Sequence, residues 1–163
     1  SDLNILTLLS GLEKEHSVVM GRDYVVFLDS TMARFLWKTD AGKRFLLSVE
    51  QMPELKCKGR FLDDAIAAEH NIPISDRRYG DLIWLANNGV LIFPDYFHDK
   101  ETHNKGMHGY VTNHDDMKGF FLSFGPDIKP RVFDQVDLID VCPSICEAVG
   151  VRSPKNNKGN CLV

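Results

Sequence analysis

Residues 24–37 read YVVFLDSTMARFLW, and this stretch decides the fold of the first part of the chain. Tyr24–Leu28 is a short apolar run with two β-branched valines, as in buried strands. The polar residues that follow, Asp29 to Thr31, are typical of a turn. Because Met32–Trp37 returns as a second strand-like run, the stretch predicts a β-hairpin.

Helical patterns flank this hairpin. Asp2 is a plausible N-cap for a first helix ending near His16, in which leucines recur at helical spacing: Leu3, Leu6, Leu9 and Leu12. Residues 40–52 are expected to form a second helix, closed by Pro53. Residues 60–62 predict a short strand and residues 62–69 a third helix, with acidic residues at its positive N-terminal end.

A second hairpin is expected over residues 81–93. Two apolar runs, 81–86 and 90–93, flank the sequence Asn87-Asn88-Gly89. Asn88 and Gly89 are the residues that most readily adopt the positive φ angles of a type I′ turn. The polar stretch 94–104, rich in His and Asp, is expected to be an exposed loop.

The C-terminal third predicts one strand and one helix. Residues 119–124 form an apolar run stopped by Gly125-Pro126. Residues 137–149 are expected to contain a helix, with Pro143 in its first turn and Gly150 at its C-terminal cap. The interleaved strands and helices indicate an α+β fold, divided into a segment 1–104 and a segment 105–163.

The composition excludes two kinds of partner. The net charge of −4 gives no positive patch of the kind that binds nucleic acid or an anionic membrane. No apolar run approaches the roughly 20 residues of a membrane-spanning helix. The chain is therefore expected to have no nucleic-acid-binding patch and no membrane segment.

Three histidines, His98, His103 and His108, recur at equal spacing. Neutral imidazole is a common zinc ligand, so a three-histidine metal site is one interpretation. A spacing of five fits neither a helix face nor a strand face, so surface histidines are the favoured alternative. His108 differs from the other two because glycines at 106 and 109 allow the backbone to approach an ion closely.

The context of His108 carries a resemblance. Gly106-Met107-His108-Gly109-Tyr110 is followed, in order, by Met117, an apolar run ending in Gly125-Pro126, a helix with the start Asp140-x-x-Pro143, and Pro154-Lys155-Asn156-Asn157. In these motifs and their spacing, residues 105–159 resemble the C-terminal part of type I phosphodiesterases/nucleotide pyrophosphatases of the alkaline phosphatase superfamily. Residues 1–104 would then be the variable insert, or cap subdomain, that such enzymes carry before this motif.

The resemblance implies a function for the whole enzyme and a role for one residue here. The family hydrolyses phosphodiesters with two zinc ions and a Thr or Ser nucleophile, and the histidine of this motif binds one zinc. That role falls on His108. The small-molecule substrate would be a phosphodiester or nucleotide, and two metal ions would stabilise the attacking and leaving oxygens.

The family's other metal ligands are missing from this sequence. It contains no Asp-His-Gly turn, and no nucleophile opens a helix. Ser30 or Thr31 follows a strand but leads into the hairpin, so we favour a turn or pocket-lining role for them. The chain is therefore expected to be the C-terminal piece of a larger enzyme, inactive alone and contributing one zinc ligand.

Three residues are candidates for the substrate pocket: Thr31, Tyr79 and Tyr110. Tyr79, Trp37 and Trp84 could stack on a base, although packing within the protein is the favoured role for them. Related superfamily enzymes (a phosphomonoesterase, phosphonate hydrolase, sulfatase or phosphate mutase) and a non-catalytic binding module remain alternatives. A truncated sheet would also favour self-association.

Overall fold

The computed structural model describes residues 2–70, 72, 74, 77–98 and 106–163. The chain divides into two compact units, Ser1–Lys118 and Gly119–Val163. The fold is α+β, as the sequence predicts. The boundary between these units follows Lys118, so residues up to 118 belong to the first unit. The division into a cap and a core segment at 104/105 stays a prediction.

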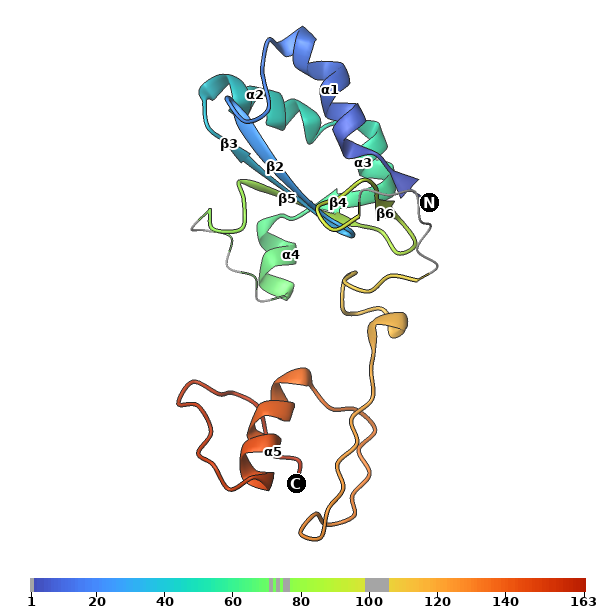
Figure 1. Ribbon diagram of the computed structural model, residues 1–163, viewed down its shortest axis with the longest axis vertical. Helices are drawn as coiled ribbons and strands as arrows, with labels where there is room; N and C mark the ends of the chain where they lie inside the picture. Colours follow the sequence, from blue (N-terminus) through green and yellow to red (C-terminus); the bar gives the residue numbers. More distant parts are fainter. Residues whose placement is uncertain (1, 71, 73, 75–76, 99–105) are drawn as a thin grey trace. The chain divides into compact units, whose positions relative to one another are not determined.

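The first unit contains a four-stranded antiparallel sheet (Figure 1). The predicted hairpin at 24–37 is confirmed, with Tyr24 opposite Trp37 and Asp29 opposite Met32. The strand order is β2-β3-β5-β4, comprising β2 (Tyr24–Asp29), β3 (Met32–Trp37), β5 (Leu82–Ala86) and β4 (Gly59–Phe61).

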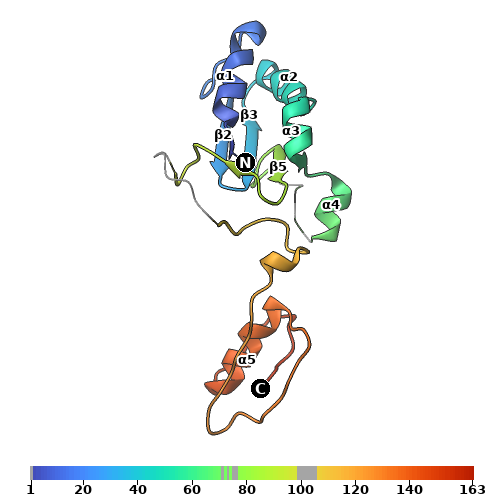
Figure 2. The ribbon, with the colours of Figure 1, turned by 90° about the vertical axis from the view of Figure 1, so that its right-hand side faces the viewer.

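One face of this sheet is covered by helices (Figures 1 and 2). Tyr24, Phe35 and Trp84 project from that face and are fully buried. They pack in one core with residues of the helices α1 (Ile5–His16), α2 (Asp40–Val49) and α3 (Pro53–Lys58). Alternation along the strands explains this arrangement, because every second side chain faces the same side.

Two helix predictions need correction. Asn4, not Asp2, caps α1, and its side chain accepts a hydrogen bond from Thr7 N at 2.9 Å. Asp2 lies instead in a two-residue strand, β1 (Asp2–Leu3), which pairs in parallel with β6 (Leu91–Ile92). The helix expected over 40–52 ends at Val49, and Pro53 opens α3, where its missing N–H costs nothing.

The predicted third helix is confirmed as α4 (Asp64–Glu69). Asp63 is its N-cap and accepts a hydrogen bond from Ile66 N at 2.8 Å. Among the described residues, no helix is long and apolar enough to cross a bilayer.

The hairpin predicted over 81–93 is wrong in its pairing. A turn does form, with Val90 N donating to Asn87 O at 3.0 Å and Gly89 at φ 78°. Asn88 has no positive φ, so the turn is not type I′. Turns outside the I′ and II′ classes splay the flanking strands, and here β5 joins the four-stranded sheet while β6 pairs with β1.

The second unit is built around α5 (Val141–Ala148), preceded by a 3-10 turn over Leu138–Asp140. The predicted roles of Pro143 and Gly150 are confirmed. Gly150 has φ 71° and, with Val151, closes a Schellman cap on the carbonyls of Glu147 and Cys146.

The strand expected over residues 119–124 is absent from the described structure. Phe120 is 94% exposed and Phe124 87% exposed. An apolar run becomes a buried strand only when a neighbouring strand and a second layer are present. Within this unit the described residues supply no such partner strand.

Candidate functional site

The turn of the first hairpin, Ser30-Thr31, is the point where distant segments of the first unit meet. Both residues are buried. The carbonyl of Ser30 accepts a hydrogen bond from Ile92 N at 2.8 Å, and that of Thr31 accepts one from Ala86 N at 2.9 Å. The ends of β5 and β6 therefore hold this turn, which we call the Ser30-Thr31 corner.

The glycine-histidine motif is attached to this corner. Thr31 Oγ1 donates to the carbonyl of Gly109 at 2.8 Å. Gly109 has φ 92°, and a side chain there would place Cβ 3.1 Å from that hydroxyl oxygen. Both the positive φ and the close approach therefore favour glycine at this position.

Tyr110, the residue after Gly109, is the second anchor of the motif. Its hydroxyl donates to Val90 O at 3.0 Å, and its ring packs against the core. Burial raises the pKa of this hydroxyl. His108 directly precedes these two anchored residues and is exposed. The segment thus presents one imidazole to solvent, on a backbone that is held at the two residues after it.

A second histidine lies against the same corner. His98 Nδ1 is 3.4 Å from Ser30 Oγ and 3.0 Å from the Oδ1 atom of Asp95, whose side chain is fully buried. Burial alone would raise the pKa of Asp95, but hydrogen bonds from Ser30, His98 and two backbone N–H groups outweigh it, so the pKa is lowered. Asp95 is therefore a buried carboxylate that orients His98.

Ser30, His98 and Asp95 do not form a nucleophilic triad, despite their residue types. In such a triad the serine contacts Nε2 of the histidine while the carboxylate contacts Nδ1. Here both Ser30 and Asp95 contact Nδ1. The arrangement cannot transfer the serine proton to the imidazole in the usual way.

The predicted site residues are only partly brought together. Thr31, His108 and Tyr110 belong to one corner. Tyr79 does not belong to it. Tyr79 lies just before the start of β5, where Asp81 N donates to Phe35 O, whereas Thr31 is hydrogen-bonded to Ala86 at the end of β5. Trp84 is a core residue and cannot stack on a ligand.

Zinc binding by His108 stays a prediction. Among the described residues, no three His, Cys, Asp or Glu side chains are grouped as a metal site would require. His103, from the equally spaced histidines, lies outside the described residues. The sequence analysis did not predict that His98 lies at this corner. The available signal was the spacing Asp95-x-x-His98 just after a strand-like run.

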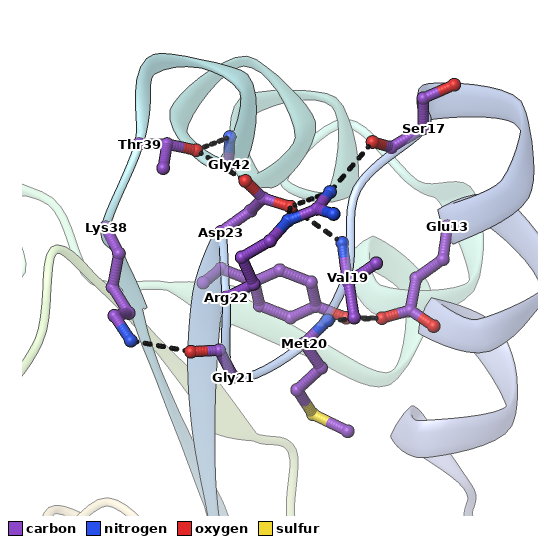
Figure 3. A network of polar contacts seen from close by, with 11 residues as sticks. Glu13, Ser17, Val19, Met20, Gly21, Arg22, Asp23, Lys38, Thr39 and Gly42 are labelled. Atoms are coloured by element: carbon purple, nitrogen blue, oxygen red, sulfur yellow. Dashed lines mark hydrogen bonds and ion pairs between the residues drawn. The ribbon is translucent and has the colours of Figure 1, made fainter.

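A third polar cluster is structural (Figure 3). Asp23 accepts hydrogen bonds from Val19 N at 2.9 Å and from Thr39 Oγ1 at 3.0 Å, and it pairs with Arg22. The Arg22 hydrogen bond is the main cause that lowers the pKa of Asp23. Thr39 in turn caps α2 through Gly42 N. The Asp23 carboxylate therefore has a structural role, because its partners link the end of α1, the start of β2 and the start of α2.

Comparison with known proteins gives no assignment. The chain matches no protein-family model, and no solved structure matches it significantly.

Proposed function

We propose that this chain supplies His108 as one zinc ligand to a two-zinc phosphodiesterase or nucleotide pyrophosphatase. Residues 1–104 would form the cap beside the metal centre, and residues 105–163 would form the C-terminal segment of the core. The proposal rests on the ordered motifs from Gly106 to Asn157. Zinc supplies Lewis acidity and a polarised nucleophile in such centres.

The observation that best supports the proposal is the fixing of the backbone directly after an exposed imidazole. Thr31 holds the carbonyl of Gly109, and Tyr110 is held by Val90. His108 itself makes no hydrogen bond or ion pair with another residue of the described chain. One imidazole nitrogen must be free to bind a metal ion, and the acceptor that usually holds the other nitrogen would have to come from outside the described residues.

Thr31 and Tyr110 have supporting roles in this proposal. Thr31 does not act as the nucleophile, because its hydroxyl donates to a backbone carbonyl inside a buried turn. It holds the loop that carries His108. Tyr110 anchors the same loop, and its partly exposed ring would form one wall of the substrate pocket.

The test uses the complete gene product that contains this chain. We expect it to bind two zinc ions and to hydrolyse bis(p-nitrophenyl) phosphate. His108→Ala should lose one zinc and lower kcat/KM by more than about 100-fold, because a metal ligand is removed. His114→Ala, the same change at an exposed histidine six residues away, should retain both zincs and full activity.

Two results would reject this assignment. Retention of two zincs and full activity by His108→Ala would show that His108 is no ligand. Faster hydrolysis of p-nitrophenyl sulfate than of the phosphodiester would assign the enzyme to the sulfatase branch instead.

A further inference from the structure

The solvent-facing side of α5 carries two free cysteines. Cys142 is exposed and Cys146 is half-buried, whereas Pro143 and Ser144, which lie between them in the sequence, are buried. Side chains four positions apart on a helix lie on the same face. Free cysteine is among the residue types most often buried in proteins. Packing in a core therefore does not account for this pair.

The two thiols interact with each other in apolar surroundings. A hydrogen bond joins the Cys142 and Cys146 side chains. Ile145 and Val149, which are 55% and 63% exposed, share the same face of the helix at helical spacing. Desolvation, followed by the charge and the hydrogen bond of Cys146, raises the pKa of the Cys142 thiol. Cys142 is therefore protonated at neutral pH.

A disulfide is one use of such a pair, and the helix geometry disfavours it. The Cβ atoms of residues four apart on a helix are about 5–6 Å from each other, whereas a disulfide needs about 3.5–4.5 Å. Closing the S–S bond would therefore distort α5 at the turn that Ser144 ties to Leu162. A protonated thiol is also a poor nucleophile, which slows oxidation of the pair.

An ion bound between the two sulfurs fits this gap better. Two metal–sulfur bonds of about 2.3 Å each can bridge sulfurs up to about 4.6 Å apart. Thiolate ligands select soft ions, copper(I) among them. A structural zinc ion takes about four ligands, and in the described part of the chain no third His, Cys, Asp or Glu side chain joins the pair. The pair therefore suits an ion that two ligands satisfy.

We infer that Cys142 and Cys146 form a two-coordinate binding site for copper(I). Binding forms two copper–sulfur bonds and releases the two thiol protons to solvent, with no change in oxidation state. The positive ion offsets the repulsion between two thiolates at this spacing. The site uses only residues of the second unit, so it does not depend on the zinc ligand proposed at His108.

The test is an anaerobic titration of the reduced 163-residue chain with copper(I), in competition with the chelator bicinchoninate. We expect one ion per chain, with two sulfur ligands in its X-ray absorption spectrum. Cys142→Ser and Cys146→Ser should each weaken binding by more than about 100-fold, because a ligand is lost. The matched control is the double variant Cys57→Ser/Cys161→Ser, which removes the two cysteines outside α5 and should bind copper(I) as tightly as the unchanged chain.

Two results would overturn the inference. Equal copper(I) affinity in Cys142→Ser and in the unchanged chain would show that the pair is not the site. Loss of binding in the double variant would assign the ion to Cys57 or Cys161. Because the double variant keeps α5 unaltered and has no other thiols, sulfur coordination of copper(I) in it tests the site without changing the helix.

Discussion

The two units of this chain differ in how many apolar side chains they bury. In the first unit, Trp84, Tyr24, Phe35 and Phe45 are fully buried in one apolar core. In the second unit, Asp140 and Ser144 are buried while Phe120 and Val132 are 94% and 96% exposed. In the first unit the helices cover the apolar face of the sheet. In the second unit, no other residue of the unit covers these apolar side chains.

Polar tethers hold the second unit in place of a core. Asp140 Oδ1 accepts a hydrogen bond from Asn160 N at 2.7 Å. Ser144 Oγ donates to Asp140 O at 2.6 Å and accepts from Leu162 N at 2.9 Å. Gly159 passes so close to Ile139 that a Cβ would lie 2.0 Å from its carbonyl oxygen. The C-terminal residues are therefore bound to the start of α5 by directional contacts.

The comparison predicts unequal effects for two aromatic truncations. Trp84→Ala removes a fully buried ring and its hydrogen bond to Leu55 O, so it should destabilise the first unit by about 3–5 kcal/mol. Phe124→Ala should change stability by less than about 0.5 kcal/mol, since that ring is 87% exposed. Urea unfolding measures both. An equal loss in the two variants would mean that the second unit has a core of its own.

A smaller effect is expected from the polar tether. Ser144→Ala leaves the buried amide of Leu162 without its acceptor, which costs about 1–3 kcal/mol. Hydrogen exchange should show faster exchange at Leu162 and along α5. Ser123→Ala, in the same unit but outside the tether, should leave exchange unchanged. If Ser144→Ala also left it unchanged, the tether would contribute nothing to the order of this unit.

The smallest effect is expected at the helix cap. Gly150→Ala forces a side chain into left-handed backbone at φ 71° and should cost about 1 kcal/mol. Gly119→Ala is the control, because its backbone is not left-handed and its Cβ would enter open space. Exchange rates at the last turn of α5 distinguish the two. Equal rates would show that the Schellman cap does not limit fraying.

The sequence predicted local elements better than the partners with which they pair. The hairpin at 24–37 and the cap at Gly150 depend on neighbouring residues, and both are confirmed. The pairing of β6 with β1 joins residues about 90 positions apart, and no local pattern encodes it. The prediction of a strand at 119–124 was wrong for the same reason. An apolar run indicates that its residues tend to be buried, but it does not indicate which segment would cover them.

Some residues of the candidate site were predicted from the sequence and others were not. His108, Thr31 and Tyr110 were chosen from motif and turn positions, and the structure brings them to one corner. Tyr79 was chosen for its residue type alone, and it lies at the other end of β5. His98 was missed because its partner, the buried Asp95, is recognisable only once the loop is folded. Self-association, expected from uncovered apolar surface, stays a prediction.

The central claim is that His108 binds zinc, and anomalous scattering at the zinc edge tests it most directly. Crystals of the complete gene product, grown with zinc, should show an anomalous peak about 2.0–2.1 Å from an imidazole nitrogen of His108. A second peak should lie about 3.5–4 Å from the first, as in two-metal hydrolases. Zinc fully coordinated by other residues, with His108 still exposed to solvent, would contradict the claim.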